Sequence, residues 1–193
     1  HNNRYANGSC FWLQGTNNSL VEENEVYYCH RNVFTLGNSS NNTIRRNYIH
    51  SRDYADIPGG YNSSGINGDR GDGGFTLYPA SNNLYENNIG EGNDRGVDIE
   101  AAGSAVDNTF LANIAIGNVY GAVVNARGST LGTMPQRNEF KNFVAVDSTA
   151  LGLYLRGNLD TRCDNCTVIG TVPGITADFS PSWPGNGFYS VFF

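Results

Sequence analysis

Short apolar stretches recur along the chain, and each is bordered by asparagine or glycine. Alternation of apolar and polar residues over three or four positions predicts very short β-strands, and the intervening Asn and Gly predict turns between them. Residues 82–103 show one unit in two halves, apolar-x-x-Asn-x-apolar and then small-apolar-x-apolar: Leu84, Asn87 and Ile89, followed by Gly96, Val97, Asp98 and Ile99. The unit predicts two short strands that meet at an Asn corner.

Both halves of this unit recur. The Asn half is found at 21–26, 44–49 and 110–115, and in a form one residue shorter at 140–145 and 163–168, which aligns Asn24, Asn47, Asn87, Asn113, Asn142 and Asn165. Neighbouring positions in this alignment are 23, 40, 26, 29 and 23 residues apart, so the shortest period is 23 and the excess residues are insertions. A unit of this length cannot bury its apolar residues alone, which predicts a coil of stacked parallel strands.

The Asn-x-apolar and Gly-apolar-x-apolar pattern resembles the right-handed parallel β-helix proteins of the pectate lyase-like superfamily. The resemblance covers roughly residues 8–178 and implies an all-β, single-stranded right-handed parallel β-helix, a solenoid of about seven rungs. It also implies that the aligned Asn residues stack at a corner. Physical chemistry supports that placement, because Asn tolerates left-handed backbone and its amide can both donate and accept. We expect residues 1–179 to form the β-helix and 180–193 a C-terminal cap or contact segment, in what we expect to be a piece of a longer chain.

Charge and hydropathy exclude two kinds of partner. The chain has 12 Lys and Arg against 18 Asp and Glu, so its net charge of −6 would repel nucleic acid. No apolar run is long enough for a membrane span. Few Lys and several Asn-x-Ser/Thr sequences favour an extracellular or cell-surface location.

The four cysteines leave alternatives open. Cys163 and Cys166 align with Phe140 and Phe143, which are core positions on either side of a corner, so they form either a disulfide or a buried reduced pair. No second ligand pair follows them, which disfavours zinc. Cys10 and Cys29 fall near the same turn in consecutive rungs and could form a second bridge.

Candidate chemistry lies on the outer face of the apolar-x-apolar strands. Alternation places the middle residue of each strand and the residue after its second apolar position outside the coil, in two adjacent columns. Asp98 and Glu100 share this outer face and could bind Ca²⁺ or divide acid and base roles in catalysis, or they could be a solvated surface pair. Alanine at both positions should then remove no packing. The further candidates are Arg95 and Arg156 for catalysis and Tyr154, Thr76 and Tyr78 for substrate.

Two insertions flank this face. The longer one, a Gly- and Asp-rich loop at residues 50–73, begins at His50, a candidate substrate-binding residue, and leads into the strand at Phe75. We expect it to leave the coil on the side of Asp98. A second insertion surrounds residues 126–137. Binding residues concentrate in such loops on rigid scaffolds.

Two functions follow from these features. The first is an extracellular carbohydrate-active or carbohydrate-binding β-helix, and the resemblance implies polysaccharide lyase or hydrolase chemistry, with Ca²⁺ as the expected cofactor in lyases and Arg95 or Arg156 taking the proton. The second is a non-catalytic cell-surface, adhesin or filament-forming β-helix. End-on self-association or flanking domains, and burial of the aromatic C-terminal residues Phe188, Phe192 and Phe193, fit this second function.

Overall fold

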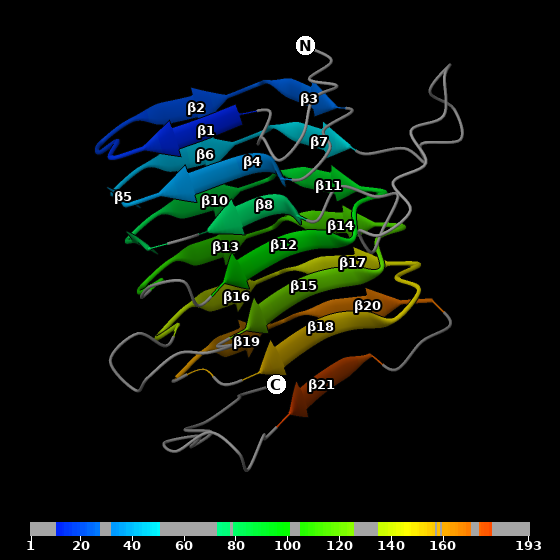
Figure 1. The fold of residues 1–193 in the computed structure, drawn as a ribbon. Helices are drawn as coiled ribbons and strands as arrows, with labels where there is room; N and C mark the ends of the chain where they lie inside the picture. The colour runs from blue at the N-terminus through cyan, green and yellow to red at the C-terminus, as the bar shows by residue number, and fades with distance from the viewer. Residues whose placement is uncertain are drawn as a thin grey trace, which may run out of the picture.

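The computed structural model describes residues 11–27, 32–50, 73–77, 79–100, 105–125, 135–156, 158, 160–170 and 174–178 of the 193-residue chain. Its described regular elements are all β-strands, and none of its described residues forms a helix able to cross a membrane. The strands wind into a coil whose rungs stack along one axis (Figure 1). The predicted parallel β-helix is therefore confirmed.

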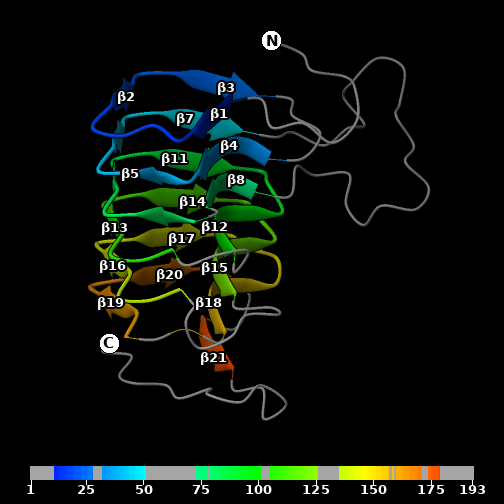
Figure 2. The same cartoon turned by 60° about the vertical axis from the view of Figure 1, so that its left-hand side comes forward.

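Three parallel sheets run the length of the coil (Figures 1 and 2). Sheet 1 has seven strands: β1 (Phe11–Gln14), β4 (Asn32–Gly37), β8 (Gly73–Leu77), β12 (Arg95–Glu100), β15 (Tyr120–Asn125), β18 (Leu151–Arg156) and β21 (Ile175–Asp178). Sheet 2 has six: β2 (Leu20–Glu22), β6 (Thr43–Arg45), β10 (Leu84–Glu86), β13 (Thr109–Leu111), β16 (Glu139–Lys141) and β19 (Arg162–Asp164). Sheet 3 also has six: β3 (Glu25–Tyr27), β7 (Tyr48–His50), β11 (Ile89–Glu91), β14 (Ile114–Ile116), β17 (Val144–Val146) and β20 (Thr167–Ile169).

The chain passes from sheet 1 to sheet 2 at the first corner, from sheet 2 to sheet 3 at the second, and from sheet 3 back to sheet 1 at the third. The short pair β5 (Ser39–Ser40) and β9 (Ala80–Ser81) lies at the first corner. In two rungs, the corners are built from residues five apart along the chain: Asn83, Asn88 and Asn93, then Asn108, Asn113 and Asn118. Each of these buried Asn residues follows a residue with positive φ, which turns the chain sharply.

Asparagine ladders tie the rungs together at the corners. At the second corner, the Asn47 Nδ2 atom donates to Asn88 Oδ1 at 3.0 Å, and Asn88 Nδ2 donates to Asn113 Oδ1 at 2.9 Å. A parallel ladder at the first corner joins Asn42, Asn83, Asn108 and Asn138. Because each amide both donates and accepts, identical residues satisfy one another inside the coil.

The predicted ladder register is wrong at Asn87, Asn142 and Asn165. Asn87 is exposed and has φ of 53°, whereas its neighbour Asn88 occupies the ladder. Asn142 and Asn165 hold the same positive-φ position two and three rungs on, with φ of 52° and 53°, and the predicted stacking of these two is present on the exposed side of the corner, where Asn165 Nδ2 donates to Asn142 Oδ1 at 2.7 Å. The ladder positions in those rungs are taken by Phe143 and Cys166, so no rung is one residue shorter at this corner.

Sheet 2 carries the largest side chains of the core. The rings of Tyr85, Phe110 and Phe140 stack with centroids 4.8 Å apart, which equals the spacing of strands in a sheet. Burial raises the pKa of the Tyr85 phenol well above its ordinary value. The facing positions of sheet 3 are small, Gly90, Ala115 and Ala145 among them. The core is therefore wide at sheet 2 and narrow towards the third corner.

The cysteine at the end of the sheet 2 core column pairs across the second corner. Cys163 and Cys166 form a disulfide, with Cα atoms 5.9 Å apart, so the bridged alternative is the correct one. Cys10 and Cys29 lie outside the described residues, as do the aromatic residues of 180–193.

The corner at Asn47 and the strand at Phe75, which border the long insertion, are as predicted. Strand β7 pairs directly with β3 and β11, and β8 pairs directly with β4 and β12. Among the described residues, no strand therefore lies between these neighbours. Their path, and hence the side on which they leave the coil, lies outside the described residues.

Candidate functional site

The outer face of sheet 1 carries the predicted columns. Asp98 pairs in register with Thr76 on one side and Val123 on the other, and Val123 pairs with Tyr154. At the top of the same column Trp12 is 54% exposed. The predicted register of the column is therefore confirmed, although Val123 is 3% exposed and does not face solvent as predicted.

Asp98 itself is not solvated. It is 1% exposed, and Arg95 Nη1 donates to its Oδ2 atom at 2.7 Å. The Arg95 Nε atom also lies 3.5 Å from Asp94 Oδ2. The prediction that Asp98 faces water is wrong, because alternation fixes the side of the sheet on which a residue lies but not what packs over that side. Alanine at position 98 would remove the acceptor of a charged, largely buried hydrogen bond.

An aromatic pair lies beside this ion pair. Tyr120 pairs in register with Arg95, and its ring stacks on that of Tyr154 with centroids 6.2 Å apart and planes inclined by 22°. Both tyrosines are partly exposed. Arg95, Asp98, Tyr120 and Tyr154 thus lie on three consecutive rungs, β12, β15 and β18, and we call them the sheet 1 surface.

The other predicted residues of this face are placed by backbone register. Glu100 pairs with Asn125, and Asn125 pairs with Arg156, so Glu100 and Arg156 stand two rungs apart, about 10 Å along the column. Their side chains and that of Thr76 lie outside the described part of the structure, as does Tyr78 altogether. Catalytic roles for Glu100 and Arg156 stay predictions.

His50 lies on a different sheet from Asp98. It ends β7 in sheet 3, where its Nε2 atom is 3.0 Å from Glu25 Oε1 and its ring stacks on Tyr48 with centroids 4.5 Å apart. The Tyr48 hydroxyl donates to Glu91. The structure therefore places His50 in a polar network on sheet 3, not among the residues of the sheet 1 surface.

Among the described residues, no three His, Cys, Asp or Glu side chains gather as a metal site. The Asp98 carboxylate already binds a guanidinium group, which competes with any cation for Oδ2. Calcium binding by Asp98 and Glu100 stays a prediction.

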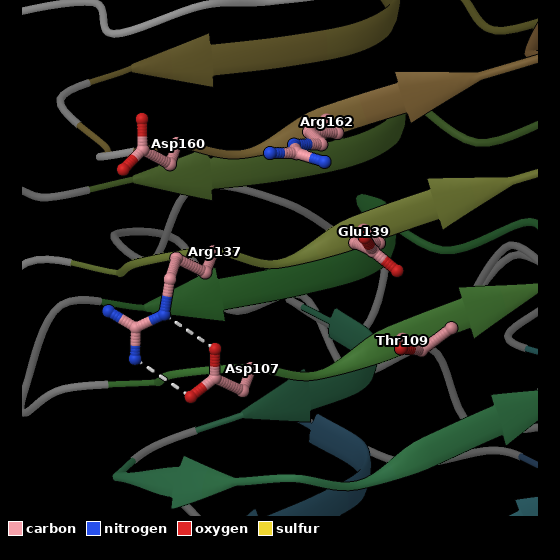
Figure 3. A pocket seen from close by; sticks show the side chains of 6 residues that line it. All are labelled: Asp107, Thr109, Arg137, Glu139, Asp160 and Arg162. Atoms are coloured by element: carbon pink, nitrogen blue, oxygen red, sulfur yellow. Dashed lines mark hydrogen bonds and ion pairs between the residues drawn. The ribbon is translucent and has the colours of Figure 1, made fainter.

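A groove that the sequence did not predict lies at the first corner. It encloses about 460 Å³ and is lined by two columns of side chains on three rungs (Figure 3): Asp107, Arg137 and Asp160 at the corner, and Thr109, Glu139 and Arg162 at the starts of β13, β16 and β19. We call it the first-corner groove.

The groove contains a bidentate ion pair. Arg137 donates to Asp107 from Nε at 2.7 Å and from Nη2 at 2.8 Å (Figure 3). These hydrogen bonds hold the pKa of Asp107 below its usual value and raise the pKa of Arg137. The corner members of the groove have positive φ; Asp107 and Arg137 precede the ladder residues Asn108 and Asn138, and Asp160 precedes the buried Thr161. Ladder positions at successive corners are five residues apart, and this spacing in the sequence could have been used to align Asp107 with Arg137.

Comparison with known proteins agrees with this architecture. A family model described as a right-handed beta helix region matches residues 1–140. A search of curated proteins gave no match. From the family match over most of its length, together with the stacked parallel sheets and Asn ladders, the chain belongs to the right-handed beta helix family.

Proposed function

We propose that this protein is an extracellular carbohydrate-binding β-helix that holds a polysaccharide on the sheet 1 surface. The observation that carries the proposal is the stacked, partly exposed pair Tyr120 and Tyr154. Aromatic rings offer flat apolar area with a polar edge, which suits a sugar ring with an apolar C–H face and hydroxyls around it. The guanidinium of Arg95, whose side chain is 26% exposed, adds hydrogen-bond donors on the adjacent rung.

The geometry supports binding better than acid–base catalysis by Asp98. A general acid or base must reach the proton that it transfers. The Asp98 side chain is almost fully buried, and one of its oxygens accepts from Arg95. The proposal has a catalytic version, in which Glu100 or Arg156 takes part in lyase or hydrolase chemistry on the bound polysaccharide.

Binding can be measured by calorimetry with a panel of uronate and neutral polysaccharides, with and without Ca²⁺. Tyr154→Ala should weaken binding at least about tenfold, since it removes one of two stacked rings. Tyr48→Ala is the matched control, because Tyr48 is a partly exposed tyrosine on sheet 3. Product formation in the same mixtures tests the catalytic version. Absence of binding across the panel, or equal losses in both variants, would contradict the proposal.

The second candidate is a non-catalytic structural β-helix. The outer face of sheet 3 favours it, because its lower rungs present partly exposed or exposed aliphatic side chains: Ile89, Ile114, Ile116, Val144, Val146 and Ile169. Contiguous apolar surface often marks protein–protein contacts. Light scattering that shows mass rising with concentration, in a protein that binds no member of the panel, would favour this function over the first.

A further inference from the structure

The first-corner groove is polar on both walls. Five of its six lining residues carry charges, and the sixth is Thr109. The groove faces away from the core column of sheet 2, because Thr109 and Glu139 flank the buried Phe110 and Phe140 in sequence and lie on the opposite side of the strand. An apolar ligand would leave these charged groups desolvated and unpaired, so the groove suits a hydroxyl-rich ligand.

Two of its charged pairs are already satisfied. Asp107 is held by Arg137, and Glu139 accepts from Lys141 Nζ at 2.5 Å, with Lys141 just outside the groove. Asp160 and Arg162, in contrast, are exposed, and neither side chain has a hydrogen bond or ion pair with another described residue, although the Asp160 charge helps to raise the pKa of Arg137. They stand two residues apart on the same rung, and Figure 3 shows Asp160 in the corner column and Arg162 in the column at the strand starts. These are the two groups that a ligand would engage first.

The charges of the groove favour neutral over acidic hydroxyl-rich ligands. The lining has three carboxylates and two guanidinium groups, so its formal net charge is −1. The chain as a whole carries −6. A polyanion such as a polyuronate would meet a carboxylate beside each guanidinium, and long-range repulsion would oppose its approach.

We propose that the first-corner groove binds a neutral saccharide unit. Carboxylates accept hydrogen bonds from neighbouring hydroxyls of a sugar, with Asp160 in this role, while the Arg162 guanidinium donates to hydroxyl or ring oxygens. The volume of about 460 Å³ lies within the range of small-molecule sites. This site lies on sheet 2 and does not depend on the sheet 1 surface, so it goes beyond the function proposed above.

The test uses the whole chain and three defined probes: cellohexaose and mannohexaose as neutral saccharides, and hexagalacturonate as the acidic counterpart. Titration by NMR or calorimetry up to about 5 mM covers the weak affinities of shallow sites. At least one neutral hexasaccharide should bind, and the double variant Asp160→Ala, Arg162→Ala should weaken it by about tenfold or more. Thr109→Tyr, which narrows the groove without removing a charge, should have a similar effect.

Matched controls separate this site from its alternatives. Glu23→Ala with Arg46→Ala removes an exposed acid and arginine at the second corner and should leave the affinity unchanged. Tyr154→Ala should also leave groove binding intact, so failure of the sheet 1 surface and failure of the groove give different results. The proposal is overturned if no neutral probe binds, if the groove variants bind as the wild type does, or if hexagalacturonate binds the Tyr154→Ala variant more tightly than both neutral probes do. Thermal melting of each variant confirms that it is folded.

Discussion

At the scale of single residues, two neighbouring asparagines have different structural roles. Asn87 has left-handed backbone and is exposed, whereas Asn88 is 1% exposed and engages both adjacent rungs. The Asn88 Oδ1 atom accepts from the Asn47 backbone N–H and from Asn47 Nδ2, each at 3.0 Å. Its Nδ2 atom donates to Ile44 O at 2.8 Å as well as to Asn113. The role of an Asn in this fold is therefore set by position within the corner, not by residue type.

Replacing Asn88 with Ala should destabilise the protein by about 1–3 kcal/mol, because it leaves buried donors and a carbonyl without partners. Asn87→Gly should change stability by less than about 0.5 kcal/mol, since glycine accepts positive φ without strain. Urea unfolding of both variants gives the two values. Equal effects would mean that the ladder hydrogen bonds contribute little beyond the backbone pairing.

At the scale of the elements, the sequence predicts sheet 1 to the residue and the second corner only in part. Sheet 1 was predictable because an apolar-x-apolar strand after a small residue has one register that buries both apolar side chains, as in Val97 and Ile99. The register of the second corner was not predictable, because either Asn87 or Asn88 could be the Asn of the repeated pattern. In a later rung the ladder position is occupied by Phe143. Alignment on Asn residues therefore selected the neighbouring Asn142 instead.

The candidate site was predictable to a similar degree. The pattern places Asp98 and Tyr154 on one column, and the structure agrees. It could not show that Asp98 is buried against Arg95, nor that Arg137 meets Asp107 thirty residues earlier. Such pairs form between residues of neighbouring rungs. Because the insertions vary in length, the sequence does not show which residues of successive rungs are aligned.

Glycine near the start of a sheet 1 strand is required by the packing of the strand and not by a turn. A Cβ atom at Gly121 would lie 2.3 Å from Gly152 O and 2.7 Å from Ala145 Cβ. Backbone of the next rung cannot retreat without breaking the pairing of β15 with β18. Close approach of stacked rungs thus explains the glycine before the apolar-x-apolar residues at Gly96, Gly121 and Gly152.

Gly121→Ala should therefore destabilise the protein by about 3 kcal/mol or more, at or above the upper end for overpacking, because a fixed carbonyl obstructs the methyl group. Gly117→Ala is the matched control: its φ is 60° and nothing lies within 4 Å of the added Cβ. That change should cost about 1–2 kcal/mol from left-handed backbone alone. Thermal or urea unfolding compares them, and a larger loss in the Gly117 variant would show that conformation rather than crowding limits these positions.

At the scale of the whole molecule, stability is the sum of contacts between successive rungs, since each rung touches its neighbours above and below. The second-corner ladder runs through Asn47, Asn88 and Asn113 and then gives way to Phe143. One rung further, the Cys163–Cys166 disulfide closes the same corner covalently. A covalent link thus stands at this corner where the buried amide ladder has stopped, beside the exposed hydrogen bond of 2.7 Å from Asn165 Nδ2 to Asn142 Oδ1.

The disulfide should stabilise its own rung more than the rest of the stack. Closing a loop of about four residues is worth roughly 2 kcal/mol in the chain-entropy account. In the variant Cys163→Ala, Cys166→Ala, amide hydrogens of β19 and β20 should exchange roughly 20- to 30-fold faster, while those of β10 and β11 stay unchanged. Hydrogen exchange followed by mass spectrometry or NMR resolves these strands, and wild-type protein in reductant should match the variant there. Faster exchange of equal size in all four strands would instead show that the coil opens as one cooperative unit, and that the bridge at one end stabilises every rung.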